Sequence, residues 1–143
     1  MSTIDALARL CQAPLTEVQF EWFEWAGKRV DLVRVRFATQ AADLIVECDA
    51  MGWGLRTRHG PLDPGDMGEL GATAVEDAEA HDVFGGGRIE DVRSLTVDLS
   101  PLPIGVALIS DNGVRTYLFN WGDDLVLTHD LYPGIAVNDP VGR

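Results

Sequence analysis

Three histidines and their acidic neighbours are the first candidates for metal chemistry. Asp77 and His81 lie four residues apart, which on a helix places both side chains on one face. A zinc site needs two more ligands, and neither His59 nor His129 follows a spacing typical of one. We therefore interpret Asp77 and His81 as an exposed ion pair, and the sequence predicts neither a metal site nor a cofactor.

The sequence also lacks the patterns typical of a catalytic nucleophile or a phosphate-binding loop. Cys11 and Cys48 lack a neighbouring glycine, histidine or helix-start pattern, and we expect both to be buried free thiols. Ser100 and Ser110 lack the G-x-S-x-G motif of a nucleophilic serine. The glycines at 85–87 precede an expected strand, whereas a phosphate cradle leads into a helix. The sequence therefore predicts no catalytic residue and favours a protein that is not an enzyme.

The chain is strongly acidic, with 23 Asp and Glu against 11 Lys and Arg in 143 residues, and its formal net charge is −12. Nucleic acids and anionic membranes both bind basic surfaces, so we expect neither as a partner. A surplus of negative charge attracts basic proteins and increases solubility.

Most of this charge lies in the segment 61–91, which has nine acidic residues and one basic residue and so carries −8 of the −12. Two interpretations stay open: a solubilising surface, or a face that docks a basic protein. A helix is expected to begin at Thr73, because Thr73 and Glu76 form a capping-box pattern. On the second interpretation the partner-binding residues of this helix are Glu76, Asp77, Glu79 and Asp82.

One of the four tryptophans lies in an acidic turn. Trp121 is followed by Gly122, Asp123 and Asp124 between two expected strands. Such a tryptophan either packs over a sheet edge or is presented as an anchor for a partner. Trp121, Asp123 and Asp124 therefore join the candidate partner-binding residues.

Alternating apolar residues predict a β-rich α+β protein of one domain, 1–143. We expect an antiparallel sheet of about seven or eight strands, bent into a sandwich or open roll, with two short helices. Ser2 is expected to cap the first helix, Asn112-Gly113 to form a type I′ hairpin turn, and the tail from Pro133 to be irregular. A change of apolar parity at Leu32 and Val33 predicts a β-bulge. The expected strands are 16–25, 29–37, 44–48, 53–57, 88–99, 104–110, 114–119 and 124–129.

A short internal match suggests duplication of a three-strand meander. Residues 28–34 align without gaps on 87–93, with three identities and two conservative differences, which would make 16–58 and 86–130 repeat halves. The alternative is that any two strands that follow a glycine turn look alike.

The first residues, Met1 to Cys11, carry Asp5 and Arg9 within an apolar stretch, which is unlike a secretory signal. No apolar run reaches the length of a membrane span. We expect a cytoplasmic protein.

The C-terminal pattern resembles small acidic bacterial proteins of unknown function, including immunity proteins of polymorphic toxin systems. The residues that carry this resemblance lie between about 85 and 130: Gly87-Arg88-Ile89, Pro103-Ile104-Gly105, Asp111-Asn112-Gly113 and Asn120-Trp121-Gly122-Asp123-Asp124. The resemblance implies a non-enzymatic protein that neutralises a basic toxin by occluding it. Two other functions stay open: a small-molecule binding module with a pocket between sheet and helix lined by tryptophans, and a structural homodimer joined through a sheet edge.

Overall fold

The computed structural model describes residues 2–50, 52–64, 71–98, 100 and 102–138, and within them it contains two antiparallel sheets of five strands each. The first sheet has the order β4-β3-β2-β1-β5 and the second has the order β10-β6-β7-β8-β9. The β-rich α+β class is confirmed, but the described strands number ten rather than the expected seven or eight. The strands are β1 (Leu15–Trp25), β2 (Lys28–Thr39), β3 (Asp43–Cys48), β4 (Leu55–Arg58), β5 (Ala72–Ala78), β6 (Ile89–Val97), β7 (Pro103–Ser110), β8 (Arg115–Trp121), β9 (Asp124–Thr128) and β10 (Ile135–Val137).

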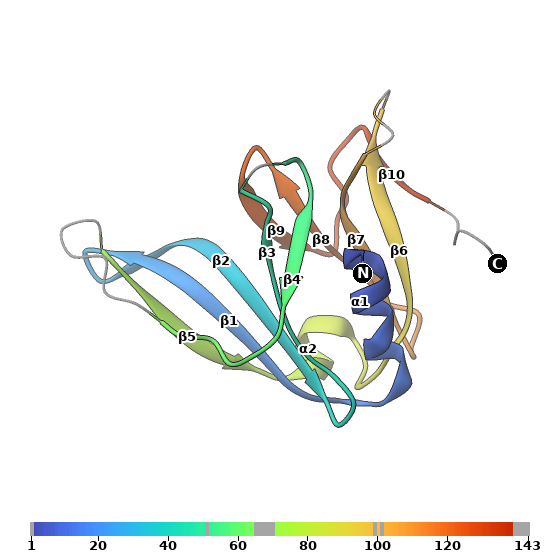
Figure 1. Cartoon of the computed structure of the whole chain (residues 1–143), viewed down its shortest axis with the longest axis horizontal. Coiled ribbons are helices and arrows are strands. Elements are labelled where there is room, and N and C mark those ends of the chain that lie inside the picture. The colour runs from blue at the N-terminus through green and yellow to red at the C-terminus, as the bar shows by residue number, and fades with distance from the viewer. Residues whose placement is uncertain (1, 51, 65–70, 99, 101, 139–143) are drawn as a thin grey trace.

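The two sheets face each other over a common apolar core and splay apart at one side (Figure 1). Helix α1 (Thr3–Ala8) packs against β6 and β4, and helix α2 (Ala80–Phe84) packs against β1, β7 and β8. The Ser2 side chain accepts a hydrogen bond from the Asp5 amide at 3.2 Å, which confirms the expected cap of α1. Strands β1, β2 and β5 extend beyond the second sheet, and we call this extension the arm (Figure 1).

Two-residue turns set the long hairpins of both sheets. Ala26 and Gly27 connect β1 to β2 with φ of 51° and 78°, and Gly122 and Asp123 connect β8 to β9 with φ of 59° and 72°. Positive φ at both positions matches the twist of the flanking strands. The expected bulge in β2 is confirmed, since Glu21 pairs with Arg34 while Trp22 pairs with Leu32, which leaves Val33 as the extra residue.

The expected helix at Thr73 is wrong. Residues 72–78 form the edge strand β5, paired antiparallel with β1, and helix α2 begins only at Ala80. A capping-box pattern is local, whereas the long free edge of β1 offers seven residues a ladder of backbone hydrogen bonds. The glycines at 85–87 do end the helix, because Gly85 takes the left-handed conformation with φ of 72°.

Two further details of the C-terminal half differ from expectation. The tail is not wholly irregular, because β10 pairs with β6 as the edge strand of the second sheet, and Ile135, Val137 and Leu131 pack against its second apolar cluster. The hairpin at Asn112-Gly113 is confirmed, but its turn is not type I′, because only Gly113 has positive φ. The Gly113 amide donates to the Ser110 carbonyl at 2.9 Å, so the connection is a three-residue loop that ends in a left-handed glycine.

Both sheets share one topology, a four-strand meander whose first strand also pairs with the fifth. A short helix precedes each meander. The two matching segments do not occupy equivalent strands. Residues 28–34 lie in β2, the second strand of the first meander, and residues 87–93 lie at the start of β6, the first strand of the second. Duplication of a three-strand unit therefore stays a prediction.

No helix within the described residues combines the length and apolarity that crossing a bilayer requires.

Candidate functional site

The acidic residues predicted to share one helical face are separated in the structure. Glu76 and Asp77 are neighbours on strand β5, so their side chains point to opposite faces of the first sheet. Glu76 accepts hydrogen bonds from the indole of Trp22 at 3.2 Å and from Arg29 at 2.8 Å, while Asp77 accepts one from Gln19 at 2.8 Å. Both carboxylates are therefore engaged by side chains of the same sheet.

Glu79 and Asp82 lie further along, at the start of α2. Glu79 is the residue before the helix and Asp82 is in its first turn. Glu79 and Asp77 line a hollow of about 470 Å³ together with Glu17 and His81. Across the residues that the structure describes, no group of three or more His, Cys, Asp or Glu side chains is arranged to hold a metal ion.

The other predicted partner-binding residues lie at the β8–β9 turn and next to it: Trp121, Asp123 and Asp124. Trp121 is 41% exposed, and its ring contacts Phe119 and Tyr132 edge-on, with centroid distances of 6.1 and 5.4 Å. Part of the indole is therefore packed, and part of it is exposed to solvent.

A second exposed tryptophan, Trp53, was not selected from the sequence, and its loop lies next to the β8–β9 hairpin. Trp53 is 72% exposed in the loop between β3 and β4. The next residue, Gly54, accepts a hydrogen bond at 3.0 Å from the side chain of Asn120, which precedes Trp121. Asn120 also accepts a hydrogen bond from the Asp123 amide at 2.8 Å, so one buried side chain ties this loop to the β8–β9 turn.

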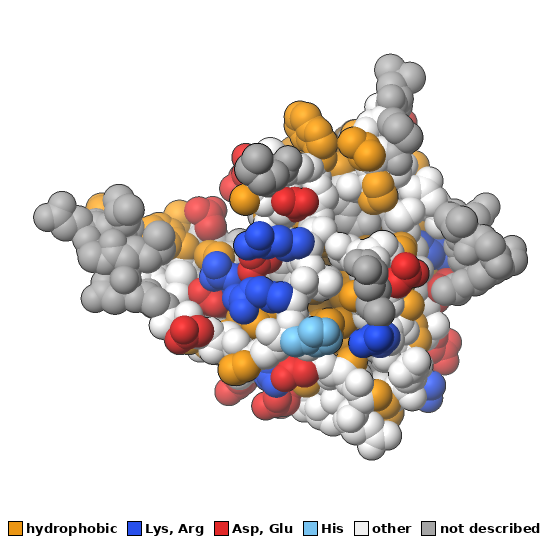
Figure 2. All heavy atoms as spheres, in the orientation of Figure 1, with side chains coloured by type: hydrophobic (Ala, Val, Ile, Leu, Met, Phe, Trp, Pro, Cys, Tyr) orange, Lys and Arg blue, Asp and Glu red, His pale blue; other side chains and the backbone are white. Residues whose placement is uncertain are grey.

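Exposed hydrophobic side chains gather at this end of the molecule (Figure 2). We define the aromatic surface as the exposed residues Trp53 and Leu102, which line one pocket, together with Trp121 and Tyr132, whose rings contact each other. Tryptophan and tyrosine are among the residue types that contribute most binding energy at protein interfaces. These exposed side chains are therefore candidates for an interaction site.

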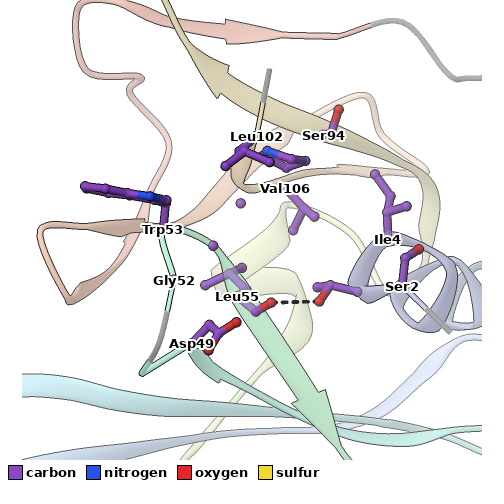
Figure 3. Close-up of a pocket in the computed structure, with 13 residues that line it drawn as sticks. Ser2, Ile4, Asp49, Gly52, Trp53, Leu55, Ser94, Leu102 and Val106 are labelled. Carbon is purple, nitrogen blue, oxygen red and sulfur yellow. Dashed lines mark hydrogen bonds between the residues drawn. The ribbon is translucent and has the colours of Figure 1, made fainter. Parts of the chain in front are cut away.

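A pocket of about 520 Å³ lies beside Leu102 and the backbone of Trp53, whose ring points away from the other side chains that line it (Figure 3). Its wall is mostly apolar, and the hydroxyl of Thr3 donates to the Leu55 carbonyl at 2.8 Å, which holds α1 against β4. Gly54 allows the β3–β4 loop to approach β7 closely, because a Cβ there would lie 2.8 Å from the Pro103 carbonyl oxygen. The volume suits one large side chain or a small ligand. The residues that line it are Ser2, Thr3, Ile4, Asp49, Gly52, Trp53, Gly54, Leu55, Ser94, Leu102, Pro103, Gly105 and Val106.

Carboxylates also lie at this end. Asp49 lines the pocket, Asp123 lies in the β8–β9 turn and Asp124 begins β9. Burial raises the pKa of the Cys48 thiol to about 11, with smaller contributions from Asp123, Asp124 and Glu47. Cys48 and Cys11 do not form a disulfide, as expected, but both are half-buried rather than fully buried.

Arginines concentrate on the outer face of the first sheet, where carboxylates pair with them (Figure 2). Glu47 is buried and accepts hydrogen bonds from Arg56 at 2.7 Å, Arg34 at 2.9 Å and Arg58 at 3.2 Å. Burial alone would raise the pKa of Glu47, but these three guanidinium groups lower it below its ordinary value. The spacing of two between Arg56 and Arg58 was the available sequence signal, because it places both on one face of a strand.

Other arginines are paired as well. Arg29, Arg36 and Arg93 each form an ion pair with a carboxylate of their own sheet. Arg34 and Arg56 line a hollow that Asp123 and Asp124 also line.

Comparison with protein-family models, curated proteins and solved structures found no match to this chain. The exposed aromatic residues and the carboxylates near them are therefore the features that bear on function.

Proposed function

We propose that this chain is a non-enzymatic binding protein that neutralises a basic protein partner by occlusion, in the manner of an immunity protein acting on a toxin. The observation that carries the proposal is the aromatic surface beside an apolar pocket, bordered by Asp49, Asp123 and Asp124. Exposed tryptophans supply contact energy, and the surrounding carboxylates select a cationic partner and speed its association. The net charge of −12 strengthens that attraction at a distance.

This proposal moves the binding site away from the acidic segment foreseen at 76–82. Glu76 and Asp77 already have hydrogen-bond partners within the first sheet, so a partner would have to displace them. Asp123 is in the turn next to Trp121, and Asp124 pairs with Trp121 across the hairpin. Of the candidate residues taken from the sequence, Trp121, Asp123 and Asp124 are retained.

A small-molecule binding module is the second candidate, and the pocket favours it. The cavity lies between α1 and the second sheet, as that alternative requires, and Trp53 is at its mouth. A module of this kind would bind an apolar ligand of moderate size. Binding would then be insensitive to salt, whereas occlusion of a basic protein weakens as salt rises.

The test is neutralisation of the protein encoded beside this chain's gene. We expect that protein to contain a basic domain that arrests bacterial growth, and co-expression of this chain to relieve the arrest. Double substitution of Trp53 and Trp121 by alanine should abolish relief. Trp25→Ala is the matched control, since Trp25 is 52% exposed at the tip of the arm and should leave relief intact. Relief that survives the double substitution, or a neighbouring protein without toxicity, would refute the proposal.

A further inference from the structure

Strand β9 presents an open edge. Within the described residues β9 pairs only with β8, and it is the last strand of the second sheet. Because the turn has two residues, Trp121 and Asp124 form a hydrogen-bonded pair. From there, non-hydrogen-bonded and hydrogen-bonded pairs alternate along the antiparallel ladder. The backbone N–H and C=O groups of Leu125 and Leu127 therefore point away from β8, toward the free edge.

That edge lies beside a partly exposed apolar face. The arm extends beyond β9 (Figure 1), and Trp22, Val30 and Leu32 of the arm line a hollow next to this strand. Val30 is 54% exposed. A cavity of about 440 Å³ lies between this face and the strand, lined by Phe20, Trp22, Val30, Asp31, Leu32, Asp124, Leu125, Val126 and Leu127.

The apolar face is held in place by polar contacts around its largest side chain. The indole N–H of Trp22 donates to Glu76 at 3.2 Å. The guanidinium group of Arg29 lies 5.6 Å from the centre of the Trp22 ring and pairs with the same carboxylate. Trp22 is thereby presented in one orientation, as a preformed binding surface requires.

We propose that an extended segment of a basic protein adds to β9 as a further strand and lays its apolar side chains on Trp22, Val30 and Leu32. Backbone hydrogen bonds to Leu125 and Leu127 would supply affinity, and alternate side chains would supply specificity. Asp31 and Asp124 line the groove and favour a segment in which basic residues alternate with apolar ones. A second copy of this chain would also carry a net charge of −12, and the repulsion between the two copies disfavours self-association.

This inference rests on the proposed basic partner but uses a different surface from Trp53 and Trp121. A defined probe tests it: an acetylated, amidated hexapeptide of alternating valine and lysine, titrated into ¹⁵N-labelled protein. Amide hydrogen exchange at Leu125 and Leu127 should slow at least about tenfold at saturation, because open edge amides become hydrogen-bonded. The amides of Val126 and Thr128 already bond to β8 and should change little.

Two controls sharpen the test. The same peptide N-methylated at alternate backbone positions should bind at least about tenfold more weakly, and a valine–glutamate peptide should fail to bind. Val30→Lys should weaken binding, whereas Val114→Lys, in the β7–β8 loop, should not. Absent protection at Leu125 and Leu127, or protection confined to the β5 edge, would overturn the inference. Loss of neutralisation in the Trp53 and Trp121 variant together with normal peptide binding would show that the two surfaces act separately.

Discussion

Two buried carboxylates on the first sheet should respond to substitution in opposite ways. Glu47 is 6% exposed and accepts hydrogen bonds from three guanidinium groups. Glu21 is 1% exposed and accepts one from Arg34 at 2.8 Å, while its second oxygen has no hydrogen-bond partner among the described residues. We expect Glu47→Met to destabilise the fold and Glu21→Met to be close to neutral.

The magnitudes follow from these contacts. A hydrogen bond to a charged group contributes about 1.5–3 kcal/mol, and less where the donor is half exposed, as Arg56 and Arg58 are. Loss of Glu47 should therefore cost about 2–4 kcal/mol. Glu21→Met loses one such bond but also removes a buried acceptor without a partner, which itself costs about 1–3 kcal/mol. Arg34 still pairs with Glu47 in the Glu21→Met variant, so the net change in the free energy of unfolding should lie within about 1 kcal/mol.

Urea unfolding of the two variants and the parent protein, followed by tryptophan fluorescence, gives the free energies of unfolding. Acid adds a second measurement. The pKa of Glu47 is lowered from its ordinary value of 4.5, so its stabilisation is complete above that pH and is lost as the pH falls through the folded-state value. The parent protein should lose stability below about pH 4.5 more steeply than Glu47→Met. Equal losses in the two variants at neutral pH, or a larger loss for Glu21→Met, would refute this reasoning.

Three further predictions concern turns and a thiol. Ala26→Gly should raise stability by about 0.5–1 kcal/mol in urea unfolding, because alanine at φ of 51° is strained, and an unchanged or lower midpoint would contradict this. Gly113→Val should cost about 1–3 kcal/mol through its backbone alone, since a Cβ there meets no atom within 4 Å, and Gly113→Asn should cost less. Iodoacetamide should modify Cys48 slowly at pH 8.5, with the rate rising near its pKa of about 11, and faster in a protein with Asp123→Asn and Asp124→Asn. A rate that rises near the ordinary thiol pKa of 9.0 would contradict that prediction.

Sequence pattern predicted the strands well where the signal is local. Alternation in β1 and the parity change at Val33 both appear as expected, because burial of one face imposes a period of two. Strand β5 was misassigned because its pairing partner, β1, is distant in the chain. Strand β10 was missed for the same reason, since three residues acquire strand structure only by pairing with β6.

The candidate site combines residues that the sequence indicated with one that it did not. Trp121, Asp123 and Asp124 were selected because a tryptophan in an acidic turn is unusual, and the structure places them at an exposed end. Trp53 was not selected, because its proximity to the β8–β9 turn depends on the hydrogen bond between Asn120 and Gly54 across the two sheets. The grouping of Glu76 with Asp82 failed because it assumed a helix.

The central claim is that the aromatic surface binds a basic protein, and isothermal titration of the purified basic domain encoded beside this chain's gene tests it most directly. At low salt, Trp53→Ala combined with Trp121→Ala should raise the dissociation constant at least about 100-fold, since interface tryptophans each contribute about 2 kcal/mol or more. Trp25→Ala should stay within about threefold of the parent value, because the tip of the arm lies outside the aromatic surface. A dissociation constant equally unchanged by both substitutions would contradict the account.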